Sequence, residues 1–179
     1  MTYDELTALM KKRRSVRYFS DKAIDKATVE KLLKVAVLAP SVENAQPWGF
    51  HVVTNPELKA KLMETSCYGN FISGASVFIV VTCDRAAKGT ALKQTIWNPR
   101  ELEYSCVAAM HSVMLAAASM DIGSCWVSLH HGPAHNLLKL KDHMVVVGGL
   151  MLGYYKSGEA EASGEHERKP MENAICYLC

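Results

Sequence analysis

The sequence predicts a domain of the α/β or α+β class, and two features of its pattern support that prediction. Segments with apolar residues at helical spacing alternate with short β-branched runs, and capping residues or prolines separate them. Neither an internal repeat nor a linker divides the 179 residues. A chain of this length can bury one good core and is short for two. We therefore expect a single domain over residues 1–179.

The first forty residues contain sequence patterns typical of two helices. Thr2 to Glu5 forms a capping-box pattern that predicts a helix, and that helix ends in the basic run Lys11 to Arg14. Asp25 can cap a second helix with apolar residues at helical spacing. Proline lacks an amide hydrogen and disfavours helical backbone in the residue before it, so Pro40 should stop this helix.

Strand signals dominate the next part of the chain. Phe50 to Thr54 reads as a strand, and Asn55-Pro56 supplies an N-cap and a first-turn proline for a third helix. Val77 to Cys83 is an apolar, β-branched run typical of a buried central strand. The polar residues 86–98 are predicted to form a surface loop or a flap over a site.

The second half continues the alternation. Glu101 to Met120 is apolar nearly all round, so we expect a central, fully buried helix. Gly123 should end it, and Cys125 to Leu129 should form a short strand. Pro133 to Leu140 allows a short helix, and Met144 to Tyr154 predicts another buried strand. A polar loop and a brief tail follow.

Composition and charge exclude several classes of protein. Apolar residues make up 49% and charged residues 21%, a globular balance that argues against disorder. The net charge of +2, with dispersed basic residues, argues against nucleic acid as a partner. The longest apolar run, Cys106 to Met120, falls short of the ~18–20 residues of a membrane span. Without a visible signal peptide, we expect the six cysteines to be reduced and the protein to be cytoplasmic.

A cationic cluster follows the first helix. Lys11 and Lys12 compensate the negative end of the helix dipole. The cluster continues past the helix end, where no dipole needs balancing, through Arg13, Arg14, Ser15 and Arg17. Guanidinium forks beside a hydroxyl suit a phosphate group. No P-loop accompanies them, and the glycines of Gly148 to Gly153 lie within a predicted strand, unlike a Rossmann fingerprint.

The stretch Ala39 to Phe50 is a second candidate binding segment. Two prolines bracket it, and its polar side chains are Ser41, Asn44 and Gln46. A rigid loop that carries amides suits a flat polar ligand. Taken alone, the stretch favours a simpler interpretation, a capped helix end that runs into a strand. The neighbouring arginine cluster favours the binding role.

These two segments resemble the nitroreductase family of flavin mononucleotide (FMN) enzymes. The resemblance rests on four stretches in the family's order and spacing, namely Arg13–Phe19, Ala39–Phe50, Gly123–Trp126 and Arg168–Pro170. It implies an α+β fold with a mixed, mainly antiparallel sheet flanked by helices and a long buried central helix. It also implies a homodimer with FMN at the subunit interface.

The resemblance further implies which residues contact the cofactor. Those residues are Arg13, Arg14, Ser15, Arg17, Pro40, Ser41, Asn44, Asn70, Val127, Ser128 and Arg168. The arginine segment and Arg168 would hold the phosphate and ribityl chain, and the segment with Ser41 would come from the other subunit. The backbone at Val127 to Leu129 would pass the flavin N5 edge, and Asn70 is a weaker match beside the ring.

The implied activity is electron transfer from NAD(P)H through FMN to a small acceptor such as a nitroaromatic or a quinone, by a ping-pong mechanism. Flavin carries the hydride chemistry, so no catalytic side chain and no metal is required. Two alternatives stay open. One is a flavin-binding or storage protein without efficient turnover, and the other is a different family reaction, reductive dehalogenation or flavin fragmentation.

Several residues depart from the family pattern or allow other interpretations. His166 stands where many relatives have a basic residue, and His130-His131 stands where small residues are frequent, near the expected N5 position. His131 and His135 lie four apart, but Pro133 intervenes and no carboxylate joins them, which disfavours zinc. His111 reads as a core histidine or a partner or flavin contact. Cys176 and Cys179 form a CxxC pattern without a following helix, which favours a frayed terminus over a redox role.

Overall fold

The structure is a computed structural model that describes residues 1–67, 72, 74–89, 96, 98–156 and 168–178. Its strands form one sheet in the order β1-β2-β4-β3, with every neighbouring pair antiparallel. The strands are β1 (Trp48–Val53), β2 (Val77–Asp84), β3 (Ile122–Val127) and β4 (Met144–Tyr154). The α+β class and the mainly antiparallel sheet are confirmed.

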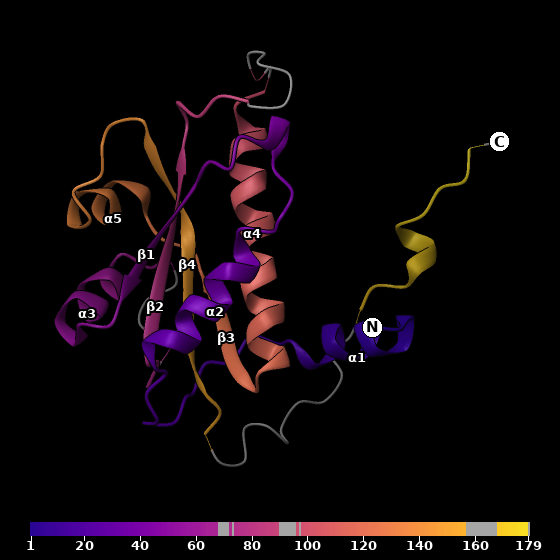
Figure 1. Ribbon diagram of the computed structural model, residues 1–179, viewed down its shortest axis with the longest axis horizontal. Helices are drawn as coiled ribbons and strands as arrows, with labels where there is room; N and C mark the ends of the chain where they lie inside the picture. The colour runs from indigo at the N-terminus through magenta and orange to yellow at the C-terminus, as the bar shows by residue number, and fades with distance from the viewer. Residues whose placement is uncertain (68–71, 73, 90–95, 97, 157–167, 179) are drawn as a thin grey trace.

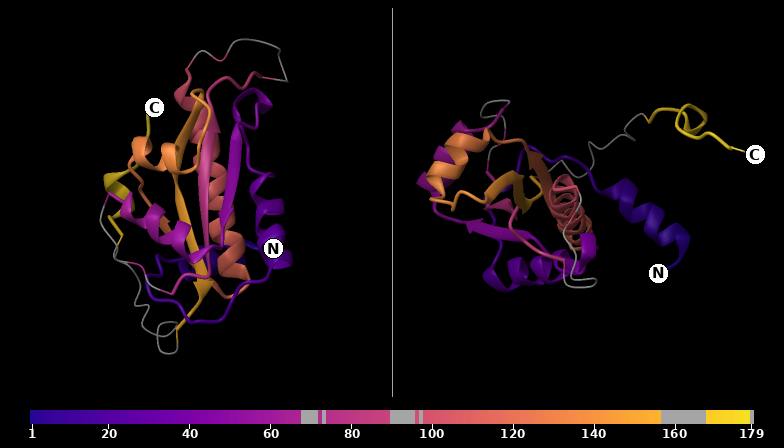
Figure 2. Two further views of the ribbon diagram at one scale, coloured as in Figure 1. Left: turned by 90° about the vertical axis from the view of Figure 1, so that its left-hand side faces the viewer. Right: turned by 90° about the horizontal axis from the view of Figure 1, so that it is seen from above.

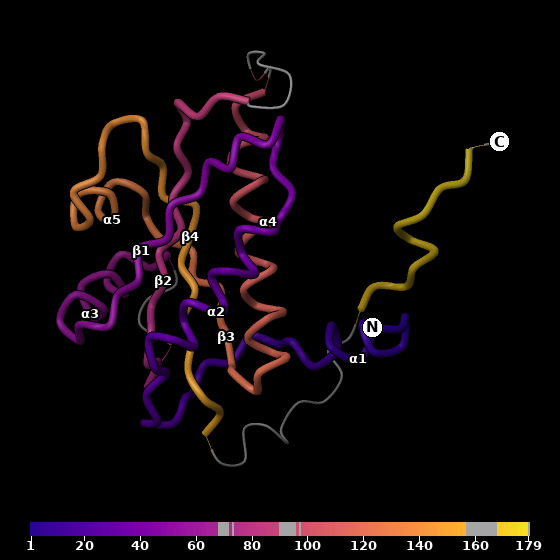
Figure 3. Tube along the Cα trace, viewed as in Figure 1, coloured from indigo at the N-terminus to yellow at the C-terminus, as the bar shows by residue number. Residues whose placement is uncertain are grey.

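Helices cover both faces of the sheet (Figures 1 and 2). One face carries α2 (Lys26–Ala36) and α4 (Arg100–Ser119), and the other carries α3 (Pro56–Glu64) and α5 (His131–Leu137). The helix α1 (Tyr3–Lys12) and residues 168–178, which include the short turn η2 (Met171–Asn173), extend to one side (Figure 3). Another short turn, η1 (Val42–Asn44), precedes β1.

The central strand β2 explains why two cores form. Successive side chains of a strand point to opposite faces. Val77, Ile79 and Val81 pack beneath α2 and α4, whereas Phe78 and Val80 pack toward α3 and α5. All five are fully buried, so a continuous apolar run fits a strand covered on both faces.

The predicted starts of the first three helices are confirmed, whereas α5 begins at His131, two residues before the predicted Pro133. The Thr2 hydroxyl accepts a hydrogen bond from the Glu5 amide at 3.2 Å, and the Glu5 carboxylate accepts one from the Thr2 amide at 2.7 Å. Asp25 and Asn55 cap α2 and α3 through their side-chain oxygens. The helix α2 ends at Ala36, ahead of Pro40, so a turn over residues 37–39 separates the helix from the proline.

The prediction that Gly123 ends the long helix was wrong. Helix α4 ends at Ser119, and the left-handed turn falls on Asp121, whose φ is 56°. Gly123 lies inside β3, where a Cβ atom would come within 3.0–3.1 Å of the Val16 side chain. This glycine therefore permits close packing between two segments far apart in sequence.

The prediction that α4 is buried on all sides was wrong for one stripe. Tyr104 is 59% exposed and Val107 38%, and His111 on the same stripe is also exposed. Their spacing places them on neighbouring turns of one helix face. His111 is therefore not a core histidine in this chain. Among the described residues, no helix, α4 included, has the length and apolar character needed to span a bilayer.

We predict that Gly149→Ala destabilises the fold by about 1–3 kcal/mol, the usual cost of overpacking a core. A Cβ atom at Gly149 would collide with the Phe78 ring. Gly132→Ala is the matched control, since nothing lies within 4 Å of a Cβ placed there. Denaturant unfolding of both variants measures the difference, and equal stabilities would contradict this packing.

Candidate cofactor-binding site

The outer edge of β3 gathers several of the predicted site residues. Ser15 pairs with Ser124 in an isolated parallel bridge, and the Val16 amide donates to the Ser124 carbonyl at 2.9 Å. Further along, the Cys67 amide donates to the Ser128 carbonyl at 2.9 Å. Ser124 and Ser128 are about 13 Å apart at ~3.3 Å per residue. The structure therefore brings Ser15, Val127 and Ser128 to one edge of the sheet.

Residues 13–17, which we call the arginine segment, form an extended chain whose side chains point alternately to two sides. Val16 is buried in the core, and on the same side the Arg14 guanidinium lies 5.6 Å from the centre of the Tyr155 ring. Burial raises the pKa of Tyr155, and the Arg14 charge partly offsets this effect. Arg13, Ser15 and Arg17 alternate with these residues. The predicted role of Arg14 as a ligand residue thus stays a prediction, while its contact with the core is observed.

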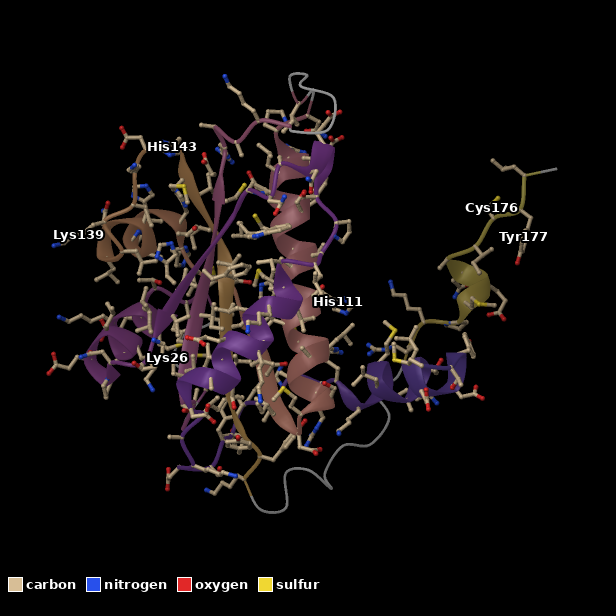
Figure 4. All side chains as sticks on the ribbon, in the orientation of Figure 1. Lys26, His111, Lys139, His143, Cys176 and Tyr177 are labelled. Atoms are coloured by element: carbon tan, nitrogen blue, oxygen red, sulfur yellow. The ribbon has the colours of Figure 1, made fainter. Side chains whose placement is uncertain are left out.

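A basic cavity of about 300 Å³ lies between α1, α4 and the C-terminal segment. Its lining residues are Thr7, Met10, Lys11, Arg13, His111 and Arg168. Figure 4 shows His111 on the side of α4 that faces α1. The predicted Arg13 and Arg168 therefore meet at one cavity. Several cationic side chains around a small volume suit an anion that accepts many hydrogen bonds.

Sequence reasoning missed three residues of this cavity and named the fourth, His111, as a core histidine or a partner or flavin contact. Thr7, Met10 and Lys11 follow one another at helical spacing toward Arg13, so the shared face was visible in the sequence. Lys11 was assigned only to the helix dipole. The apolar neighbourhood of His111 favoured a buried position, so its place beside Arg13 was not predicted.

The loop before β1 is held firmly by α4 and by its own side chains. The Val42 amide donates to the Ser105 hydroxyl at 3.0 Å, and the Gln46 amide donates to the Ser41 hydroxyl at 3.1 Å. The Gln46 side-chain amide donates to Oδ1 of the Asn44 side chain at 3.1 Å. Trp48 and Phe50 pack against the core. Ser41 and Asn44 are thus fixed in place.

Three residues of this loop adopt left-handed backbone. Glu43, Asn44 and Gln46 have φ values of 49°, 52° and 46°. Residues other than glycine rarely take this conformation, which costs about 1–2 kcal/mol for an ordinary residue. Strain of this kind persists only where surrounding structure enforces it, and it clusters at functional sites.

The loop and the arginine segment lie far apart within one chain. Trp48 pairs with Cys83, which pairs with Val145. Ser124 pairs with Leu152, about 23 Å further along β4 at ~3.3 Å per residue. The edge strands β1 and β3 are also about 14 Å apart, at ~4.8 Å per strand spacing. The register therefore separates the start of β1 from the arginine segment both along and across the sheet.

Some predicted positions fall outside the described residues, namely Asn70, His166 and Cys179. Cys176 is an exposed free thiol. Within the described part of the chain, no three His, Cys, Asp or Glu side chains are grouped to hold a metal ion.

Comparisons with known proteins identify the fold and its family. The model of the nitroreductase family matches residues 10–154. A protein of Archaeoglobus fulgidus, provisionally named an NADH dehydrogenase/NAD(P)H nitroreductase, is 34% identical over 158 residues, which cover 86% of this chain and 87% of that protein. A 5,6-dimethylbenzimidazole synthase of Rhodospirillum rubrum is 34% identical over 148 residues, 70% of each chain.

A solved structure shows the same fold. A provisionally named nitroreductase of Desulfovibrio desulfuricans, crystallised in complex with FMN, superposes with a TM-score of 0.80 at 24% identity and covers 99% of both chains. The fold and these matches define an oxidoreductase on an α+β scaffold. The chain belongs to the nitroreductase family.

We predict that Gln46→Gly is more stable than Gln46→Val by about 1–2 kcal/mol, because only glycine accepts left-handed backbone without steric cost. The same pair of residues at Val52, an exposed position in β1, serves as the control. There valine should be the more stable residue, since strands favour β-branched side chains. Thermal unfolding would refute the prediction if the order were the same at both positions.

Proposed function

We propose that this chain is an FMN-dependent NAD(P)H oxidoreductase that works as a homodimer and passes electrons to a small acceptor such as a nitroaromatic or a quinone. The single observation that carries the proposal is the basic cavity lined by Arg13 and Arg168. Arg13 lies two residues before Ser15, which bridges to Ser124 at the outer edge of β3. The FMN complex of a protein with the same fold supports the choice of cofactor.

The cavity fits the phosphate of FMN in its chemistry. Arg13 and Arg168 supply guanidinium forks, and Lys11 and His111 supply further donors around a volume of about 300 Å³. From there, Ser15 and the end of β3 lead along the sheet edge toward Ser128. We assign the phosphate to the cavity and the ring edge to the backbone of Val127 to Leu129.

The protein's task is to bind and orient, because bound flavin supplies the hydride chemistry. Peptide groups at the end of β3 would lie beside the ring edge and leave one face of the ring open. The nicotinamide donor and the acceptor would use that face in turn, which gives ping-pong kinetics. Names of relatives support NAD(P)H as the donor.

A second copy of this chain would complete the site. The rigid loop with Ser41 and Asn44 lies too far from Arg13 in its own chain. The stripe of Tyr104 and Val107 on α4 is exposed, and no residue of α1 is buried. Burial of such surfaces against a second copy would remove apolar area from water. The five described cysteines are free thiols, which fits a cytoplasmic protein.

One relative favours a second candidate reaction. The Rhodospirillum rubrum protein is named for a synthase reaction, although it shares 34% identity with this chain. An acceptor screen that follows NAD(P)H oxidation separates the candidates. Turnover with nitroaromatics or quinones supports our proposal, and slow flavin reduction by both nucleotides would indicate a binding or synthase role.

We predict that purified protein binds FMN and that Arg13→Ala weakens this binding by about 1.5–3 kcal/mol, the value of a charge-assisted hydrogen bond. Riboflavin, which lacks the phosphate, should bind both proteins equally. Flavin fluorescence titration measures both affinities. Lys26→Ala on the exposed start of α2 is the control.

An equal loss of FMN and riboflavin affinity in Arg13→Ala would place the phosphate elsewhere. A protein that is colourless and cannot be reconstituted with FMN would refute the proposed cofactor itself.

We predict that two inactive variants restore activity when they are mixed as a heterodimer. One chain carries Arg13→Ala and the other Asn44→Ala. If the two segments of a site come from different subunits, the heterodimer holds one intact site and one doubly altered site. About half of the wild-type activity per dimer should return. If each site lies within one chain, mixing restores nothing.

A further inference from the structure

The turn that follows β3 lies beside a stretch of β4 that has no β3 partner. The last pair of the two strands is Val127 with Gly149, and β4 begins earlier, at Met144. On the β2 side of β4, Thr82 pairs with Val146 and Val81 pairs with Gly148. The register therefore shifts at Val147, which has no partner in β2. Such a bulge bends a strand and leaves one residue without a partner. Backbone groups of β4 near Val146 therefore need other hydrogen-bond partners.

His131 supplies one of these partners. The Val146 amide donates to Nδ1 of His131 at 3.1 Å. A backbone amide can only donate, so Nδ1 accepts and the imidazole proton lies on Nε2. The His131 ring thus contacts β4 on the edge that pairs with β3 further along the strand. It links the first residue of α5 to β4.

His135 extends this link on the next turn of α5. Its ring centre is 5.3 Å from that of His131, and its Nε2 lies 3.2 Å from the Lys141 carbonyl oxygen. The Leu140 amide donates to the His135 carbonyl at 3.2 Å. We call His131 and His135 the two-histidine latch, because together they tie α5 to β4 and to the turn between them.

The two-histidine latch lies on the β4 side of residues 127–130. From the other side, the Cys67 amide donates to the Ser128 carbonyl at 2.9 Å, and the His130 amide donates to the Thr65 carbonyl at 2.7 Å. Val127 is also paired with Gly149 of β4, so the bond from Val146 adds to the hold on the residues that follow Val127, where the β3–β4 ladder has ended. Together, the bonds on the two sides hold the backbone of residues 128–130 in place relative to the sheet.

We propose that His131 is a positioning residue whose Nδ1 fixes the Val127–Leu129 backbone where it meets the flavin ring edge. This role rests on the proposed function for the choice of ligand, but the latch itself lies in residues the structure describes. A space-filling role predicts that any side chain of similar size would serve. A positioning role through Nδ1 predicts that the acceptor atom, not the ring, is what matters.

Two substitutions separate these roles. His131→Asn keeps an acceptor, because asparagine Oδ1 is as many bonds from the backbone as Nδ1, and it removes the ring. His131→Leu keeps apolar bulk and removes the acceptor. His143→Leu is the matched control on a histidine at the start of β4, which lies 3.8 Å from Asp84. Thermal unfolding confirms that each variant is folded.

The first measurement is amide hydrogen exchange on cofactor-free protein. His131→Leu should exchange faster than the wild type at Val146 and over residues 127–130, by about fivefold to tenfold, the value of one hydrogen bond. His131→Asn should stay within twofold of the wild type. Unchanged exchange in His131→Leu, or equal acceleration in both variants, overturns the latch.

The second measurement is the rate at which NAD(P)H reduces bound FMN, together with the FMN midpoint potential. His131→Leu should reduce its flavin about fivefold to tenfold more slowly, with a shifted potential, and His131→Asn should match the wild type. If His131→Leu folds poorly, His131→Phe, which keeps a ring and has no acceptor, replaces it in the same comparison.

Normal flavin reduction in a variant with accelerated exchange overturns the positioning role. Accelerated exchange in a chain that binds no FMN would instead refute the proposed function and leave the latch in place.

Discussion

The order of the strands is the constraint on which the site depends. With β1 and β3 at opposite edges, the rigid loop before β1 and the arginine segment beside β3 are kept apart by the full width of the sheet. No side-chain rotation can close this distance. A ligand that needs both segments would therefore require two chains. Tyr104 and Val107 leave apolar surface exposed on α4.

Local chemistry was enough to predict much of this fold. The caps at Thr2, Asp25 and Asn55 act within three residues, so their sequence patterns fixed the helix starts. The bounds of β4 follow from its apolar run. Arg13 and Arg168 were predictable as one site only through the family resemblance, since nothing local links residues so distant in sequence.

The wrong predictions have a common physical origin in contacts between residues that are far apart in sequence. Gly123 looked like a helix stop, but it leaves room for Val16, more than a hundred residues earlier. Tyr104 and Val107 looked like core residues because apolar side chains usually lie inside, but both are exposed on α4. The bond between His131 and the Val146 amide depends on where β3 stops pairing, which no local pattern encodes.

The charge distribution explains why ligand binding and the position of α1 should be coupled. No residue of α1 is buried, so packing alone contributes little to its place against α4. Its C-terminal end instead brings the charges of Lys11 and Arg13 toward that of Arg168 around one cavity. Like charges at close range repel, and the negative end of the α1 dipole offsets only part of this repulsion. An anion in the cavity would attract each of these cations and so offset their mutual repulsion. Because a ligand stabilises the state that binds it, the bound phosphate would hold α1 and the C-terminal segment against α4.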